Sequence, residues 1–370
     1  MKIAMIGHKR IPSREGGIEV VVEELSTRMV VLGHKVCVYN RRGYNVGDKN
    51  ADLEKHKLKE YKGVRIKSVY TIENKNLNAI LYSINATICA IFKHYDIIHF
   101  HAEGPCALIP LAHYFKIHTV ATIHGLDWQR TKWSGFATRF LLFGEKMAAK
   151  YADEVIVLSK NVNQYFTDTY GRETNYIPNG VNIPDCIPAD IIFTKYGLQK
   201  DNYILFLARL VPEKGVHYLL DAYKNINTNI KLVIAGGTSH TDEYVELIKE
   251  KASRDKRVVM TGFVQGIELQ ELFSNCAIYV LPSDIEGMPI SLLEALSYGC
   301  KCLVSDIPEN LEVTHEYAIS FKKSDVDDLR NKLEILLLDK NFDNSNAIAY
   351  VKQNYDWDVV VDKTLELYMR

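Results

Sequence analysis

No stretch of the sequence is apolar for long enough to cross a membrane. The longest apolar runs, such as those at residues 88–92 and 140–143, are far shorter than the roughly 20 residues that a spanning helix needs. Residues 1–6 lead directly into an expected strand, without the charged segment and cleavage site of a signal peptide. We therefore expect a cytoplasmic protein, with peripheral contact at the inner face of the cytoplasmic membrane as an open alternative.

One cysteine pattern and one glycine pattern are also absent. None of the seven scattered cysteines has a partner at the spacing of a metal site or a disulfide framework, so we expect reduced thiols in a cytosol. The dinucleotide fingerprint G-x-G-x-x-G does not occur, because Gly7 stands alone after the first expected strand. The second absence argues against a nicotinamide-dependent dehydrogenase.

Net charge is nearly absent, but the two halves of the chain differ. The formal net charge is −1, yet residues 1–185 carry 25 Lys and Arg against 18 Asp and Glu, and the remainder carries 20 against 28. A basic N-terminal half suits peripheral contact with an anionic membrane or a phosphorylated acceptor. Attraction between the two halves explains the asymmetry equally well. We expect no nucleic-acid partner.

What the sequence does contain is a double series of alternating strands and helices. Its 370 residues suit two domains. Expected strands at residues 2–6, 35–39, 64–69, 97–100, 119–123 and 154–158 precede a proline-containing connection at 177–188, and a second series begins at 203–208. Such alternation predicts two doubly wound, mainly parallel sheets, and ligands bind such sheets at the carboxyl ends of the strands.

In the first series, three strand-end loops carry polar residues and glycines. One runs from Gly7 through Arg14 to Gly16 and Gly17, where an expected helix begins. The others start with His101 and with His124, which is followed by Gly125 and Asp127. Glycine lets a backbone approach a ligand closely, and a histidine followed by glycine and aspartate favours a functional role. A glycine that merely opens a helix, or a structural histidine, is the plainer alternative.

In the second series, the corresponding loops are rich in cations and glycine. Arg209 and Lys214 lie five residues apart on one loop, where they could clamp a diphosphate, although each alone could be an ordinary surface cation. Gly236 follows the strand expected at 231–235, and Phe263 with Val264 follows the strand expected at 257–261.

The fourth of these loops is the most informative. Residues 283–299 read Ser-Asp-Ile-Glu-Gly-Met-Pro-Ile-Ser-Leu-Leu-Glu-Ala-Leu-Ser-Tyr-Gly. Pro289 suits the first turn of a helix, whose free N–H groups attract an anion. Glu286 and Glu294 flank that helix start, and carboxylates accept hydrogen bonds from neutral hydroxyls. The combination suggests a ligand with phosphates and sugar rings, a sugar nucleotide, unless the glutamates only stabilise the helix N-terminus.

A segment near residue 136 has two interpretations. Aromatic and apolar residues alternate there with cations; they are Trp133, Phe136, Phe140, Leu141 and Phe143, with Lys132, Arg139 and Lys146. Packing against the sheet is the more common arrangement for such a pattern, and an amphipathic membrane-docking face is the other.

Taken together, these motifs resemble one family. Glu286-x7-Glu294, the Arg209/Lys214 loop, Asn179-Gly180-Val181 and the Gly16-Gly17 loop resemble retaining GT-B glycosyltransferases of family 4, over nearly the whole chain. The stretch from His124 to Arg130 resembles bacterial members that build capsule or other surface polysaccharides. The resemblance implies an α/β GT-B architecture of two Rossmann-like domains facing across a cleft. Residues 1–185 would bind the acceptor and residues 186–355 the nucleotide sugar, and a last helix at 356–370 would return to the first domain.

The resemblance also implies a role for individual residues. Arg209 and Lys214 would hold the donor diphosphate, Glu286 the transferred sugar, and Glu294 the ribose, while His124 would line the sugar near its reacting carbon. The remaining donor-side residues would be Gly16, Gly17, Gly236, Phe263, Val264, Gly287, Met288, Pro289, Ile290 and Ser291. On the acceptor side the candidates are Arg14, His101, Asp127 and Asn179.

The chemistry that the resemblance implies is transfer with retention of configuration, to a glycan or a lipid-linked saccharide. Neither a cofactor nor a metal is expected. The metal-binding motif Asp-x-Asp of other sugar transferases occurs at Asp325–Asp327. These residues begin an expected helix at 325–338, and helix capping explains the two aspartates better than metal binding does. Two alternatives remain, a sugar-nucleotide epimerase of the same architecture and a non-catalytic protein that binds a sugar nucleotide. The intact motif set argues against the second.

Overall fold

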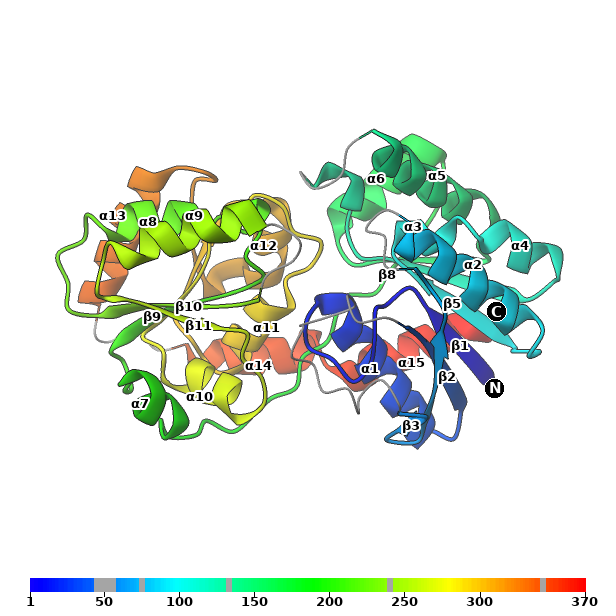
Figure 1. The fold of residues 1–370 in the computed structure, drawn as a ribbon, viewed down its shortest axis with the longest axis horizontal. Helices are drawn as coiled ribbons and strands as arrows, with labels where there is room; N and C mark the ends of the chain where they lie inside the picture. Colours follow the sequence, from blue (N-terminus) through cyan, green and yellow to red (C-terminus); the bar gives the residue numbers. More distant parts are fainter. Residues whose placement is uncertain (43–57, 73–76, 131–134, 238–241, 340–343) are drawn as a thin grey trace. The chain divides into compact units, whose positions relative to one another are not determined.

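The computed structural model describes residues 1–42, 58–72, 77–130, 135–237, 242–339 and 344–370. Contacts within the chain divide it into two compact units. Unit 1 comprises Met1–Gly180 and Trp357–Arg370, and unit 2 comprises Val181–Asp356 (Figure 1). Each unit contains one sheet, of eight and six strands respectively.

The sheet of unit 1 has the strand order β3-β4-β2-β1-β5-β6-β7-β8. All its pairings are parallel except that of β3 with β4. The central strands are almost wholly buried, as expected for parallel strands covered by helices on both faces. The strands are β1 (Lys2–Ile6), β2 (Lys35–Arg41), β3 (Glu60–Tyr61), β4 (Val64–Val69), β5 (Ile97–His101), β6 (His118–Ile123), β7 (Glu154–Val157) and β8 (Asn175–Tyr176).

Helices cover both faces of this sheet (Figure 1). One face carries α2 (Asn78–Ile91), α3 (Glu103–Cys106), α4 (Ile109–Tyr114), α5 (Phe136–Tyr151) and α6 (Lys160–Tyr170), whose apolar side chains join the core of unit 1. The other carries α1 (Gly17–Val31) and the last helix, α15 (Trp357–Tyr368), which contacts α1. At the end of α15, the Tyr368 hydroxyl lies 2.6 Å from Nδ1 of His99 on β5, which ties the end of the chain to the centre of this sheet.

The sheet of unit 2 has the order β11-β10-β9-β12-β13-β14, with parallel pairings throughout. Its strands are β9 (Tyr203–Leu207), β10 (Lys231–Ala235), β11 (Val258–Gly262), β12 (Ile278–Leu281), β13 (Cys302–Ser305) and β14 (Ile319–Phe321). One face packs against α8 (Val216–Tyr223), α9 (Asp242–Ser253) and α13 (Val326–Leu338). The remaining helices of the unit are α7 (Ile191–Tyr196), α10 (Ile267–Asn275), α11 (Ile290–Ser297), α12 (Pro308–Thr314) and α14 (Ser345–Asn354).

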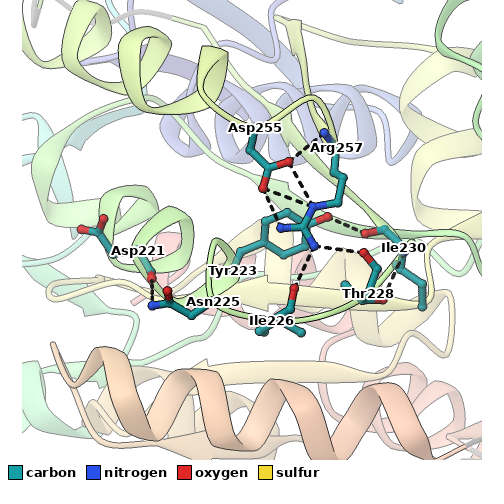
Figure 2. Close-up of polar contacts among 8 residues, drawn as sticks. All are labelled: Asp221, Tyr223, Asn225, Ile226, Thr228, Ile230, Asp255 and Arg257. Atoms are coloured by element: carbon teal, nitrogen blue, oxygen red, sulfur yellow. Dashed lines mark hydrogen bonds and ion pairs between the residues drawn. The ribbon is translucent and has the colours of Figure 1, made fainter.

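A cluster of polar contacts around Arg257 holds together the loops that precede β10 and β11 (Figure 2). The Arg257 guanidinium donates to both carboxylate oxygens of Asp255 and to the backbone carbonyls of Ile226 and Thr228. It also lies 4.6 Å from the ring centre of Tyr223 on α8. Because ligands bind parallel sheets at the opposite, carboxyl ends of the strands, we assign this cluster a structural role.

In both units the strand order reverses beside the first strand. In unit 1 the chain moves from β1 to β2 on one side and later places β5 on the other. In unit 2 it moves from β9 through β10 to β11 and then places β12 on the far side of β9. Loops that leave such neighbouring strands diverge to opposite faces and open a crevice, which is where doubly wound sheets bind ligands.

Most expected elements agree with the structure within one or two residues, and the predicted fold class is confirmed. The antiparallel edge strand β3 was not predicted. Pro289 was expected in the first turn of its helix but is the residue before it, since α11 begins at Ile290. His101 is the last residue of β5 rather than the first of the following loop. Asp325 caps α13, and its carboxylate accepts from the backbone N–H groups of Asp327 and Asp328, as predicted.

Candidate active site

The reversal point of unit 2 joins the two loops that the sequence singled out. Nζ of Lys214, which follows β9, lies 2.5 Å from Oε1 of Glu286, which follows β12. The two side chains are only 16% and 6% exposed. The Ser283 hydroxyl donates to the same Glu286 oxygen over 2.7 Å. The Coulomb attraction within this partly desolvated ion pair is therefore larger than in a pair on an open surface, before the cost of desolvation is subtracted.

The backbone holds these two loops against each other. The amide of Asp284 donates to the carbonyl of Glu213 over 2.9 Å. Gly215, which follows the 3₁₀ turn Pro212–Lys214, has a φ of +67°, and a Cβ there would lie 1.9 Å from the carbonyl oxygen of Pro282. Only glycine fits that contact. The sequence Glu-Lys-Gly thus places Lys214 beside the Ser283–Glu286 loop.

Glu286 and Glu294 both lie close enough to one buried tyrosine, Tyr279, to influence its pKa. Tyr279, on β12, donates its hydroxyl to Ser291 Oγ on α11 over 2.9 Å. Burial raises the pKa of Tyr279 well above its usual value, and both glutamates raise it further through their negative charge. Between the glutamates, Gly287, Met288 and Pro289 are buried and lead into α11. The arrangement sets two carboxylates near the start of a helix whose backbone N–H groups can accept an anion.

The other donor-side candidates lie at the same edge of the sheet, because β9, β10 and β11 are parallel. Arg209 follows β9 and is half-buried. Gly236 follows β10 and donates its N–H to the carbonyl of Gly262 over 2.8 Å. Phe263 and Val264 follow β11, and Phe263 is 36% exposed whereas Val264 is buried. Topology thus gathers all these residues at one edge.

In unit 1, the loop after β1 is held by an asparagine on β2. Asn40 Oδ1 lies 3.0 Å from Nε2 of His8 and accepts from the Ile11 N–H, while its Nδ2 donates to the Ile11 carbonyl. Glu19, in the first turn of α1, accepts from the Lys9 N–H over 2.8 Å. Gly16 precedes α1, Gly17 begins it, and Arg14 is exposed on the loop.

The loops after β5 and β6 meet through three histidines. His101 Nδ1 lies 3.1 Å from His124 Nε2. The His101 ring stacks on that of His99 with 4.2 Å between centroids, and His99 Nε2 lies 2.6 Å from the Thr122 hydroxyl. Burial lowers the pKa of His99 to about 3 and that of His124 to about 4, and it lowers the pKa of His101 well below its usual value. The three imidazoles are therefore neutral at pH 7 and act as hydrogen-bonding groups rather than cations.

The turn after His124 is fixed by buried acids. Asp127 begins the 3₁₀ turn Asp127–Gln129, and its carboxylate pairs with Arg130 at 3.0 Å. Its backbone N–H donates to the buried carboxyl of Glu103 over 2.8 Å. Asn179, the fourth acceptor-side candidate, is buried near the end of the first segment of unit 1. The structure therefore joins His101 to His124 and brings Asp127 into the same loop.

Sequence reasoning missed several residues that shape these two edges. Glu103 could have been suspected, because it is an acidic residue within the loop that follows His101. Asn40 and Tyr279 gave no such signal, because Asn40 lies beside Arg41 at the end of β2 and Tyr279 lies among the apolar residues of β12. Across the described part of the chain, no group of three or more His, Cys, Asp and Glu residues is arranged to hold a metal ion. Nor is any described helix both long and apolar enough to cross a bilayer.

Helix α5 has two distinct faces. Leu141, Gly144 and Glu145 are buried against unit 1, and Phe140 is half-buried. The outer face exposes Phe136, Arg139, Phe143, Lys146 and Lys150, at alternating spacings of three and four residues. Phe136 and Phe143 are 71% and 49% exposed. Packing against the sheet therefore accounts for the buried residues of this segment but not for these two aromatic side chains. Lys132 and Trp133 lie outside the described residues.

The two units correspond to two known domain families. Residues 15–184 match the family model described as Glycosyltransferase Family 4, and residues 189–354 match the model described as Glycosyl transferases group 1. The chain belongs to the group 1 and family 4 glycosyltransferases. This glycosyltransferase is 27% identical to an uncharacterized glycosyltransferase of Methanocaldococcus jannaschii, with 100% of this chain and 98% of the relative aligned.

Two further proteins are similar to this glycosyltransferase. It is 26% identical to the UDP-Gal:alpha-D-GlcNAc-diphosphoundecaprenol alpha-1,3-galactosyltransferase of Escherichia coli, over 75% of this chain and 76% of that enzyme. Among solved structures, Anabaena HepE in complex with UDP and glucose superposes with a TM-score of 0.81 at 18% identity, covering 99% of this chain and 98% of that one. At that identity the likeness establishes the GT-B fold.

Proposed function

We propose that this glycosyltransferase moves a sugar from a nucleotide-sugar donor to a lipid-linked saccharide, with retention of configuration, in the synthesis of a surface polysaccharide. The Lys214–Glu286 contact carries the proposal, because it sets a phosphate-binding cation beside a hydroxyl-binding carboxylate at the reversal point of the unit 2 sheet. The galactosyltransferase relative, whose name specifies UDP-galactose and a diphosphoundecaprenol-linked acceptor, supports both substrate classes.

In this proposal, unit 2 binds the donor. Arg209 and Lys214 hold the diphosphate, together with N–H groups between Gly287 and Ser291. Glu286 accepts from hydroxyls of the transferred sugar, and Glu294 from those of the ribose. Phe263 and Val264 contact the base, beside Gly236.

Unit 1 supplies the residues around the acceptor and the reacting carbon. His124 is neutral, with its ring held by His101, and it accepts from or donates to a sugar hydroxyl without adding a charge. Gly16 and Gly17 let the backbone approach the diphosphate. Arg14, Asp127 and Asn179 line the acceptor side.

The chemistry that these groups support needs charge stabilisation rather than a nucleophile of the enzyme. As the sugar–phosphate bond breaks, negative charge grows on the leaving phosphate, where Arg209 and Lys214 stabilise it. The acceptor hydroxyl attacks from the side of the leaving group, and the departing phosphate takes its proton. Since the two side-chain cations already supply the countercharge, we propose that neither a metal nor another cofactor takes part, and that activity survives a chelator.

We further propose that unit 1 contacts the membrane that holds the acceptor. The exposed α5 face, formed by Phe136, Arg139, Phe143, Lys146 and Lys150, combines aromatic rings with cations, which suits an anionic bilayer surface. Vesicles containing anionic phospholipid should bind the wild type and release the Arg139→Glu/Lys146→Glu variant. The matched control is Lys249→Glu/Lys256→Glu, which makes the same change of charge at two exposed lysines of unit 2. Equal binding by all three proteins would contradict this assignment.

The function itself is tested with a panel of radiolabelled nucleotide sugars, each incubated with and without bacterial membrane extract. Radioactivity that moves into the lipid fraction, with the α-linkage preserved from donor to product, is the expected result. An epimerised free nucleotide sugar would instead indicate an epimerase, and donor binding without any product would indicate a binding protein. Complete loss of transfer after chelation would refute the metal-free mechanism.

A further inference from the structure

Glu103 is an acid buried behind the proposed acceptor edge. It is the first residue of α3, two positions after His101, and it has no solvent exposure. Its Oε1 accepts from the backbone N–H of Asp127 over 2.8 Å, which links the end of β5 to the turn that follows β6. Its Oε2 is also buried and has no hydrogen-bond partner within the described residues. One buried carboxyl thus connects two strand-end loops.

Helix α5 closes over this acid without a gap. A Cβ at Gly144 would lie 1.9 Å from the backbone carbonyl oxygen of Glu103, so no side chain fits there. The next residue, Glu145, accepts from Trp128 Nε1 over 3.2 Å and from the Tyr165 and Tyr170 hydroxyls. Two buried acids, one on α3 and one on α5, therefore hold the backbone and the side chain of the turn Asp127–Gln129.

The surroundings of Glu103 disfavour its charged form. Burial raises its pKa well above the usual value, and the nearby charges of Asp127 and Glu145 raise it further. A cation of the same turn, Arg130, pairs with the Asp127 carboxylate. The shift favours the protonated form of Glu103, whose Oε1 accepts from the Asp127 N–H.

We propose that Glu103 is a positioning residue for glycosyl transfer: its buried carboxyl holds the Asp127 amide and so sets the loop from His124 to Arg130 against the substrate. The proposal rests on the role of this loop in the proposed function. Glu103 itself does not touch the substrate, since it acts through the backbone of Asp127. Glutamine would keep an oxygen that accepts from the Asp127 N–H, whereas leucine would fill the space and remove that acceptor.

The kinetic test compares Glu103→Gln with Glu103→Leu. We expect Glu103→Gln to keep kcat within about twofold of the wild type, and Glu103→Leu to lose roughly tenfold or more because a buried N–H loses its hydrogen bond. The KM for the donor should change less than kcat, since the diphosphate, the ribose and the base are assigned mainly to unit 2. A wild-type kcat in Glu103→Leu, or an equal loss in both variants, would overturn the proposal.

A pH profile provides a second variant test that does not need Glu103→Leu to fold. Wild-type kcat should fall at alkaline pH as Glu103 ionises and repels the Asp127 carboxylate, and Glu103→Gln should lack that decline. Identical alkaline limbs in the two proteins would refute a neutral positioning acid.

Amide hydrogen exchange at residues 126–129 separates this inference from the proposed function, because it needs no substrate. Exchange at Asp127 should be at least roughly tenfold faster in Glu103→Leu than in the wild type, and unchanged in Glu103→Gln. If the wild type transfers no sugar but the three proteins differ in exchange as expected, the proposed function fails while the positioning contact stands. If exchange is equal in all three proteins, the positioning contact fails whatever the enzyme transfers.

Discussion

The Lys214–Glu286 pair should couple the two loops of unit 2 before any substrate binds. The atoms lie 2.5 Å apart, so at an effective dielectric constant of about 20 their attraction is about 7 kcal/mol before the cost of desolvation is subtracted. Desolvation offsets much of this gain, and removing one partner of a buried pair typically costs about 3–5 kcal/mol. We expect about 3 kcal/mol for Lys214→Met and for Glu286→Gln, because Lys214 keeps some contact with water.

A double-mutant cycle measures the coupling. The double variant Lys214→Met/Glu286→Gln should lose clearly less than the sum of the two single losses, which gives a coupling energy of about 2–3 kcal/mol. The three tryptophans all belong to unit 1. The urea midpoint reported by their fluorescence therefore serves as the control and should be the same in the variants and the wild type. Amide exchange in β9 and β12 reports on unit 2.

The same variants test the donor site. Each single variant should also weaken donor binding, since one removes a phosphate cation and the other a sugar acceptor. A coupling energy below about 0.5 kcal/mol would refute the reasoning, because surface pairs reach that value without any burial. Unchanged donor binding in Lys214→Met would refute the assignment of this edge to the diphosphate.

Three further predictions concern single residues. Gly215→Ala should destabilise unit 2 by about 2–4 kcal/mol, because its Cβ would meet the Pro282 carbonyl. The control Gly171→Ala, with a similar φ of +60° and no atom within 4 Å of a Cβ, should cost only about 1 kcal/mol. Equal losses of stability in urea unfolding would exclude the Pro282 contact as the cause. The buried His99 has a pKa of about 3, against about 6.5 when unfolded, so the unfolded chain binds more protons below pH 6.5 and stability is lost as the pH falls. Between pH 7 and 5.5 the wild type should therefore lose about 1 kcal/mol more than His99→Gln by tryptophan fluorescence, and parallel pH curves would contradict this. Asp325→Ala should lower the stability of unit 2 by about 1 kcal/mol through loss of the α13 cap while leaving sugar transfer intact, and lost transfer would point to a role in the reaction.

Local patterns were enough to locate the longer strands of both sheets and the loops that carry the candidate residues, although they missed the two-residue strands β3 and β8. Apolar runs bounded by glycine and polar residues have few alternatives to a buried parallel strand, and their carboxyl ends mark the ligand edge. Glu286 and Glu294 could be selected because the strand–loop–helix pattern around them is local. The sequence left two interpretations of the segment near residue 136 open, since composition alone does not show which side of a helix a sheet covers. The exposures of Phe136 and Phe143 show that these two side chains lie on the outer face of α5.

By itself, the sequence determined the fold class, the family and the short list of residues from Gly16 to Glu294, because each depends on neighbours within a few positions. Only the tertiary structure decided which of those residues meet. Lys214 and Glu286 are 72 positions apart and become partners because β9 and β12 are adjacent. Asp127 and Glu103 meet because β5 and β6 are adjacent, and the Glu103 side chain between them is fully buried. Strand order and burial are long-range properties, and they convert a list of polar residues into an ion pair, a neutral histidine and a buried acid.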